Sequence, residues 1–191
     1  EVPVGECERC HATAEKPLGF TAVMLAAPRA AGLTFDALAA AQLLASSAPL
    51  PTGANVQALP ASTAVERDAV GYLHANCGVS CHSPSGAAPF SLRLELDAAG
   101  VAPQGIEATA AFGAINRLSR FVPPGATGDY YRIRPSDLAR STIAYRMSVR
   151  DPLTQMPPIA THVVDEDGLA AVQAWIDSMT AAPYPAPAPV Q

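Results

Sequence analysis

Apolar residues gather in four stretches of the chain, with the clearest helical spacing in the second and the fourth, and loops rich in proline and glycine separate the stretches. Residues three or four positions apart share one face of a helix, so such a stretch predicts an amphipathic helix. The apolar residues concerned are Phe35, Leu38, Leu43 and Leu44; Ala69 and Leu73; Leu138, Ile143 and Tyr145; and Leu169, Val172, Trp175, Ile176 and Met179. Only residues 90–96 alternate apolar and polar, which indicates one short strand. The pattern therefore predicts a mainly α fold.

Residues suited to helix N-caps precede these stretches, and they set the expected helix starts. They are Thr34, Thr63, Ser136 and Asp165. Thr63 and Glu66 together fit a capping box. The expected helices run from Thr34 to about residue 46, from Thr63 to Cys77, from Ser136 onward and from Asp165 onward. A further short helix is expected at about 107–118, within a region of loops at 100–135.

Composition divides the chain into three parts. Residues 1–62 form an N-terminal segment, with loop or single-turn structure over 1–20 and a proline-rich linker over 47–62. Residues 63–180 form the main domain. Residues 181–191 repeat Pro and Ala and are expected to be an extended, polyproline-like tail.

The stretch Cys77-Gly-Val-Ser-Cys81-His82 places two thiols and an imidazole together. A His directly after the second Cys is typical of c-type haem attachment. In such a site each Cys sulfur bonds one haem vinyl group, and the His is the proximal ligand of the iron. Three residues separate Cys77 from Cys81, where two are usual.

A second motif, Cys7-Glu-Arg-Cys10-His11, has the usual two-residue spacing. All four cysteines of the chain fall in the two motifs. The sequence therefore predicts two covalently attached haem c groups, with His11 as the proximal ligand of the first haem.

Three other interpretations of the cysteines stay open. Cys and His could bind one zinc ion, or the two pairs could form disulfides in an exported protein. A single haem at the second motif is the third alternative. Neither zinc nor disulfides explain why a His follows the second Cys in both motifs.

Composition and charge exclude some functions. The chain has 191 residues and a formal net charge of −5. The sequence has no basic run or stripe of the kind that is typical of nucleic-acid-binding proteins. It also has no apolar run long enough to span a bilayer. An acidic surface favours a basic partner or an encounter with a metal ion. Alanine supplies much of the apolar content, so a porphyrin would add bulk to a core that lacks it.

The location follows from the haem interpretation. No signal peptide is present, and Glu1 lies only a few residues before the first motif. We interpret the chain as a mature exported protein. Covalent haem attachment occurs outside the bacterial cytoplasm, so we expect a periplasmic or extracellular location.

From residue 66 to residue 180, the order of a helix, a Cys-pair-His motif, loops, a Met-Pro pair and a final helix with an aromatic residue resembles class I cytochrome c. The resemblance implies that 63–180 is a cytochrome c-like domain, carrying a small haem-binding extension and long loops. It also implies that the first and last helices of the domain cross, through Ala69 and Leu73 against Val172, Trp175 and Ile176. Several short sequence segments are also similar to those of a group of bacterial haem-binding proteins with two such motifs. The similar segments are Tyr72-Leu-His-Ala-Asn-Cys77, Tyr145-Arg-Met-Ser-Val-Arg-Asp151, Met156-Pro-Pro-Ile and, after the first motif, Leu18-Gly-Phe-Thr-Ala-Val-Met-Leu25.

The same resemblance implies that Met156 is the distal ligand of the second haem, beside His82. Two prolines follow Met156 and stiffen its loop, whereas Met147 and Met179 are expected to pack in the core.

For the first haem we predict His74 as the distal ligand. His74 lies one residue beyond Leu73 and so points about 100° away from the packed face. A solvent-exposed His74 is the alternative. His162, Met24 or a residue of a neighbouring molecule could supply the ligand instead.

The leading functional hypothesis is a dihaem cytochrome that carries electrons between redox partners outside the cytoplasm. A small enzyme of the dihaem peroxidase type is the alternative, although the chain is shorter than those enzymes and shows no clear acid–base pair. A third interpretation is a homo-oligomer or a subunit of an extracellular cytochrome polymer.

Overall fold

The computed structural model describes residues 3–11, 25, 33–44, 63–82 and 113–180, and these residues are mainly helical. The helices, in chain order, are α1 (Val4–His11), α3 (Phe35–Ala40), α4 (Ala64–Leu73), the π-helix η2 (His74–Gly78), the 3₁₀-helix η5 (Leu138–Arg140), α5 (Thr142–Ser148) and α6 (Glu166–Ser178). Within the same ranges, β-pairing is limited to three isolated bridges.

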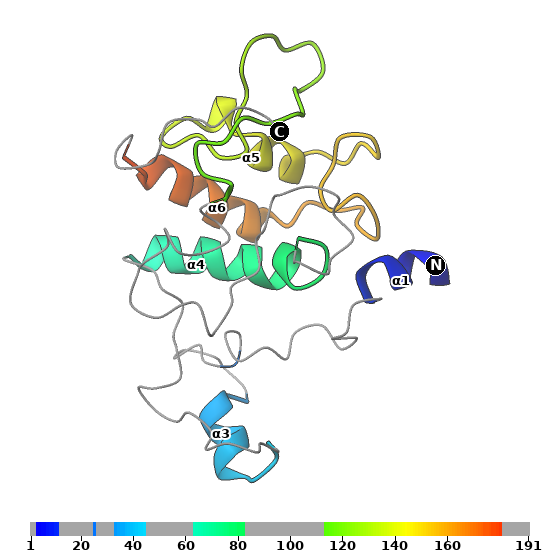
Figure 1. Cartoon of the computed structure of the whole chain (residues 1–191), viewed down its shortest axis with the longest axis vertical. Helices are drawn as coiled ribbons and strands as arrows, with labels where there is room; N and C mark the ends of the chain where they lie inside the picture. The colour runs from blue at the N-terminus through cyan, green and yellow to red at the C-terminus, as the bar shows by residue number, and fades with distance from the viewer. Residues whose placement is uncertain (1–2, 12–24, 26–32, 45–62, 83–112, 181–191) are drawn as a thin grey trace.

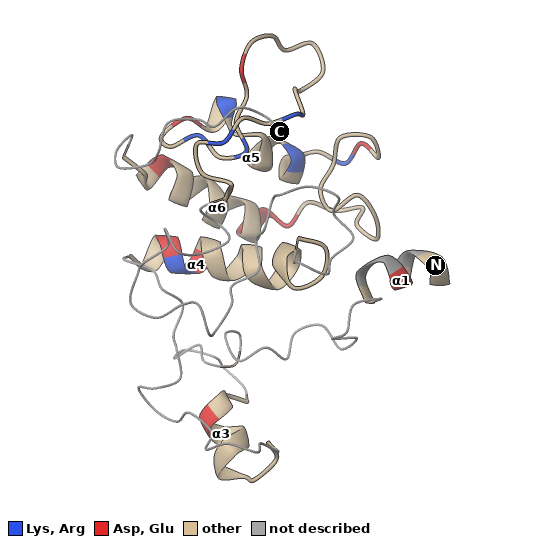
Figure 2. Ribbon diagram, viewed as in Figure 1, with Lys and Arg blue, Asp and Glu red and all other residues tan. Residues whose placement is uncertain are grey.

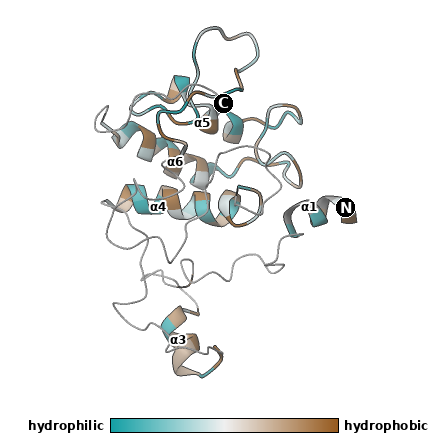
Figure 3. Cartoon of the chain, viewed as in Figure 1, coloured by the Kyte–Doolittle hydropathy of each residue, from teal (hydrophilic) through white to brown (hydrophobic). Residues whose placement is uncertain are grey.

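The core of the domain lies between α4, α5 and α6. α6 packs along α4 and also contacts α5 (Figure 1). Apolar and polar residues alternate along α4 and α6 in Figure 3, as expected for helices with one buried face. The buried cluster consists of Ala69, Val70, Leu73, Ala114, Ile115, Ile133, Ala144, Met147, Leu169, Val172, Trp175, Ile176 and Met179. The predicted buried faces of the first and last domain helices are thus confirmed, as is core packing for Met147 and Met179.

α4 begins where the sequence predicts. The Thr63 hydroxyl accepts a hydrogen bond from the backbone N–H of Glu66 at 3.1 Å. The cap satisfies one of the backbone donors that a helix start leaves without an intrahelical partner. The helix then continues without interruption into η2, which carries Cys77. The second cysteine motif therefore lies at the C-terminal end of a capped helix, as expected.

α6 also begins as predicted, and its first turn contacts α4 closely. The Asp165 carboxylate accepts from the backbone N–H of Gly168 at 3.0 Å. A Cβ atom on Gly168 would lie 2.1 Å from Cε2 of Tyr72, so only glycine allows the Tyr72 ring this close. Burial raises the pKa of the Tyr72 hydroxyl, and its hydrogen bond to Asp165 raises that pKa further. Asp165 thus caps α6 and links it to α4.

The predicted helix at about 107–118 is wrong over its described part. Residues 113–118 run beside residues 131–133 instead, through bridges between Ile115 and Ile133 and between Leu118 and Tyr131. Ile115 and Ile133 are both fully buried. Burial of this pair accounts for an extended pairing that the helical tendency of the segment alone does not favour.

The predicted helix from Ser136 is divided in two, and Ser136 is not its cap. Ser136 has a φ of 57°, and its hydroxyl donates to the carbonyl of Met179. Asp137 caps η5 instead, by accepting from the N–H of Arg140 at 3.1 Å. Ser141 then separates η5 from α5, because its backbone is extended and pairs with Tyr131.

The N-terminal helices differ from prediction in length. The first cysteine motif lies on the eight-residue helix α1, not on a loop or single turn. Thr34 caps α3 as expected, with its hydroxyl accepting from the N–H of Ala37 at 3.2 Å. α3 ends at Ala40, not near residue 46, because Gln42 takes a left-handed conformation with a φ of 57°.

Several expectations fall outside the described residues. They are the strand at 90–96, the linker at 47–62, the tail at 181–191 and any role of Met24. In the part of the chain that is described, no helix is both long and apolar enough to cross a membrane.

Candidate functional site

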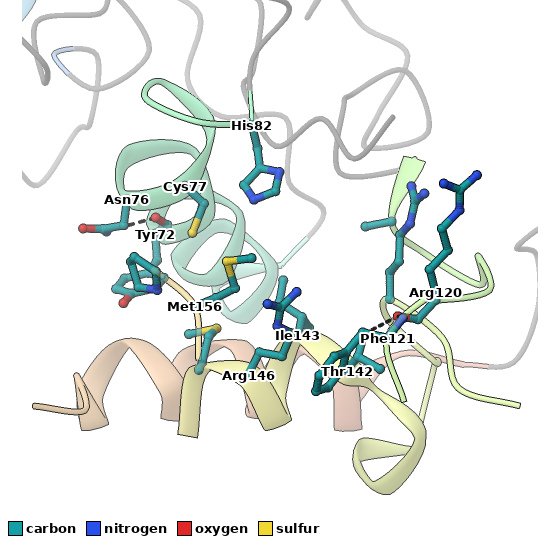
Figure 4. A pocket seen from close by; sticks show the side chains of 15 residues that line it. Tyr72, Asn76, Cys77, His82, Arg120, Phe121, Thr142, Ile143, Arg146 and Met156 are labelled. Atoms are coloured by element: carbon teal, nitrogen blue, oxygen red, sulfur yellow. Dashed lines mark hydrogen bonds between the residues drawn. The ribbon is translucent and has the colours of Figure 1, made fainter. Parts of the chain in front are cut away.

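A cavity of about 360 Å³ lies between the end of α4, the helix α5 and the loop after it (Figure 4). Its volume is within the range of small-molecule and cofactor pockets. The described residues that line it are Tyr72, Asn76, Cys77, His82, Ala114, Ser119, Arg120, Phe121, Arg132, Thr142, Ile143, Arg146, Met147, Met156 and Pro157. The cavity therefore brings together Cys77, His82 and Met156, three of the residues that the sequence predicts to act together.

The turn that carries the second motif is wider than an α-helical turn. Residues 74–78 form a π-helix, in which the N–H of Val79 bonds the carbonyl of His74 at 3.0 Å. The carbonyl of Cys77 then accepts from the N–H of His82, five residues later, at 2.8 Å. A π-turn accommodates one more residue than an α-turn. This local geometry fits the three-residue spacing of the motif and turns the His82 side chain into the cavity (Figure 4).

Cys77 and Cys81 of the second motif are not joined in a disulfide. Burial, together with the nearby Cys81, raises the pKa of the Cys77 thiol to about 12. Its sulfur faces the cavity in Figure 4. No group of three or more His, Cys, Asp or Glu side chains within the described ranges is arranged to hold a metal ion.

Met156, on the loop that joins α5 to α6, also lines the cavity (Figure 4). Its backbone N–H donates to the carbonyl of Arg146 at 2.8 Å, at the end of α5. Arg146 in turn donates through Nε to the carbonyl of Thr154 at 2.8 Å. These bonds fix the loop to α5 on both sides of residue 155.

Gln155 supports the same loop from inside. Its side chain is buried, and the amide nitrogen donates to the carbonyls of Pro157 at 3.1 Å and Thr161 at 3.4 Å. Its backbone N–H bonds the carbonyl of Asp151 at 2.8 Å. Gln155 therefore holds the loop that carries Met156, and sequence reasoning missed this contact.

Three arginines line the cavity, and sequence reasoning missed them too. Arg132 and Arg146 are half-buried, whereas Arg120 is exposed. The signal was present in the charge pattern: residues 113–150 contain seven arginines and two aspartates, in a chain of net charge −5. Figure 2 shows basic residues along α5 and on the segments next to it. The net charge predicts an acidic surface, but the part of the cavity lined by these arginines is basic.

His74 is buried, with 1% of its surface exposed. Burial lowers its pKa to about 4, so the imidazole is neutral at neutral pH. The solvent-exposed alternative for His74 is therefore wrong. His74 is absent from the described lining of the cavity.

The first motif is described in part. Cys7 and His11 are exposed on α1. In Figure 1, α1 lies beyond the η2 end of the α4 helix, the end that begins at His74. His162, an alternative ligand for the first haem, is exposed.

Comparison of the chain with models of protein families, with curated proteins and with solved structures gave no match in any of the three.

Proposed function

We propose that the chain is a dihaem c-type cytochrome that transfers electrons outside the cytoplasm, and that residues 63–180 form a cytochrome c-like domain. One observation carries the proposal. A single cavity gathers Cys77 and His82 at the end of α4 with Met156, which lies more than seventy residues later in the chain. If these residues had only structural roles, Cys77, His82 and Met156 would have no reason to line the same cavity.

The chemistry of these residues fits a covalently bound haem. A haem iron supplies one-electron transfer, with a potential that the axial ligands and the burial of the site adjust. Cys77 and Cys81, which do not form a disulfide, would each form one thioether bond to the haem, and His82 would follow them as proximal ligand. Met156, from a separate segment of the chain, would provide a thioether sulfur to the iron. Ala114, Ile143 and Met147 contribute apolar surface to the lining.

The arrangement of helices supports the proposed domain type. The motif follows α4, the Met-Pro pair precedes α6, and α4 packs along α6. A class I cytochrome c has the same order of features. This order, together with the cavity, is the basis for extending the resemblance from sequence to fold.

For the first haem, the proposed ligands are His11 and His74, with thioether bonds at Cys7 and Cys10. A buried, neutral imidazole is suited to bind iron, because a metal ligand must be unprotonated. A His without a function usually lies on the surface, whereas His74 is buried. The proposed partners are redox proteins or an extracellular electron acceptor, and assembly into a homo-oligomer or polymer remains part of the proposal.

A pair of matched substitutions tests the role of Met156. Met156→Leu and Met179→Leu each remove one thioether sulfur and nearly conserve volume, a change that costs under about 1.5 kcal/mol in a core. We expect Met156→Leu to abolish the weak near-infrared band of sulfur–iron ligation in the oxidised protein and to lower one reduction potential. Met179, which lies in the buried cluster, serves as the control, and its variant should keep both features.

If both features persist in Met156→Leu, another residue holds the distal position. A high-spin haem in the unsubstituted protein would favour an enzyme of the peroxidase type, because such an enzyme needs an open coordination site on the iron.

A further inference from the structure

Tyr72 lies between the cavity and the start of α6. Its side chain is part of the cavity lining (Figure 4). Its hydroxyl donates a hydrogen bond to the Asp165 carboxylate, the same carboxylate that caps α6 by accepting from the N–H of Gly168. The ring lies so close to Gly168 that a Cβ atom at that position would collide with it. Tyr72 therefore connects the cavity on one side with a carboxylate of another helix on the other side.

The surroundings of the Tyr72 hydroxyl keep it protonated. Burial raises its pKa most, and the hydrogen bond to Asp165 and the charge of that carboxylate raise it further. A charged Cys77 would act in the same direction, whereas Arg150 acts in the opposite one. The phenol is thus neutral at physiological pH. Asp165 is exposed, so a proton that it receives can exchange with water.

A phenol with a bonded carboxylate is suited to give up an electron and a proton together. Loss of one electron turns a phenol into a strong acid, so the electron leaves readily only where a base takes the proton. A base at hydrogen-bond distance meets this need. A redox-active tyrosine requires this pairing, whereas a tyrosine that only fills space does not.

Arg150 favours the same proton transfer. Its guanidinium is fixed at the end of α5, where Nη1 donates to the carbonyls of Met147 at 2.9 Å and Val149 at 2.6 Å. Its charge acts on the Tyr72 hydroxyl. A nearby positive charge disfavours an oxidised ring that still holds its proton, because that ring is itself a cation. Release of the proton to Asp165 removes this repulsion.

The other aromatic and sulfur side chains of the described lining are less suited to this role. Phe121 has a phenyl ring, which is much harder to oxidise than a phenol. Met147 and Met156 have thioether sulfurs and no acidic proton to release. Cys77 would already be bonded to the haem.

We propose that Tyr72 and Asp165 form a proton-coupled redox site, in which Tyr72 gives one electron to an oxidant in the cavity and its phenolic proton to Asp165. This inference rests on the proposed function, because the oxidant is the second haem after it has reacted with a peroxide. The peroxide takes two electrons from the haem group and is reduced to water, and Tyr72 returns one of the two. The O–H bond of Tyr72 breaks, an O–H bond forms on Asp165, and a neutral phenoxyl radical remains. An electron from a reduced partner protein and the proton on Asp165 then restore the phenol.

The test mixes the haem-loaded protein with hydrogen peroxide, freezes samples at increasing times and records the tyrosyl radical by electron paramagnetic resonance. Tyr72→Phe keeps the ring beside Gly168 and removes the hydroxyl. Asp165→Asn keeps a good N-cap residue and an oxygen that accepts a hydrogen bond, but the amide is not a base. Tyr145→Phe is the control, because Tyr145 packs on Phe121 with 5.9 Å between ring centroids and does not belong to the described lining.

We expect Tyr72→Phe to lose the radical signal and Tyr145→Phe to keep it. Asp165→Asn should slow its formation by about 10²-fold or more, since a positioned base contributes about 10²–10⁴-fold to a rate. A haem-loaded Tyr72→Phe variant with an unchanged signal would overturn the inference and leave the proposed function intact, and so would an Asp165→Asn variant with an unchanged rate. An intact mass without haem at Cys77 and Cys81 would overturn the proposed function itself.

If either variant does not accumulate with haem, the unsubstituted protein decides the question. A spin trap is added with the peroxide, and peptide mass spectrometry then locates the adduct. An adduct on Tyr72 supports the inference. Adducts on other residues only, or no radical at all, overturn it.

Discussion

Trp175→Ala is expected to lower the free energy of unfolding by about 3–5 kcal/mol. Trp175 lies on α6 within the buried cluster, and 2% of its surface is exposed. A buried Trp removes about 150–250 Å² from water. At about 25 cal/mol per Å² this corresponds to about 4–6 kcal/mol, an upper estimate because unfolded chains already bury some apolar surface.

Urea denaturation of the haem-loaded protein measures this loss, provided that the slope of the transition stays the same. Val163→Ala is the matched control, because Val163 is 79% exposed and a surface substitution of this kind changes stability by about 0.5 kcal/mol or less. A loss below about 1 kcal/mol for Trp175→Ala would contradict the packing of α4 against α6 and, with it, the proposed domain type.

Three further substitutions test individual contacts. Gly168→Ala should destabilise by about 1–3 kcal/mol through overpacking against the Tyr72 ring, despite the usual preference of helices for Ala; in a Tyr72→Leu background the same change should become neutral or stabilising, and equal effects in both backgrounds would contradict the contact. Gln155→Leu should cost about 1–3 kcal/mol through lost hydrogen bonds and weaken the near-infrared band of Met156, whereas an unchanged band would show that the loop does not need this side chain. His74→Ala should convert one iron from low to high spin and allow it to bind added imidazole or cyanide; a spectrum that stays fully low spin would assign the ligand to another residue or a neighbouring subunit.

Local signals made α4 and α6 predictable from the sequence. Thr63 and Asp165 form hydrogen bonds within three residues of themselves, and the apolar faces repeat at helical spacing. The region after Ser136 was not predictable in this way. There the backbone of Ser141 pairs with Tyr131, and its hydroxyl bonds the carbonyl of Asp137 at 2.8 Å. A contact between separate segments thus overrides the local preference for one continuous helix.

The candidate site shows the same division. The Cys-His motif and the Met-Pro pair could be read directly, because each is a short pattern with a specific chemistry. The positions of Arg120 and Arg132 depend on the pairing of residues 115–118 with 131–133, where the sequence predicted a helix. The side chain of Gln155 bonds backbone carbonyls, which carry no sequence signal. The burial of His74 coincides with the change from α4 to the wider π-turn, which a regular helical count does not foresee.

The mass of the intact chain tests the central proposal most directly. The protein would be purified from a bacterial host that exports it and attaches haem covalently, and then measured under denaturing conditions that remove any haem held without a covalent bond. The account predicts the mass of the polypeptide plus two haems, bonded at Cys7 and Cys10 and at Cys77 and Cys81. A mass with one haem would remove the N-terminal site, and the unmodified polypeptide mass would contradict the haem proposal at both motifs.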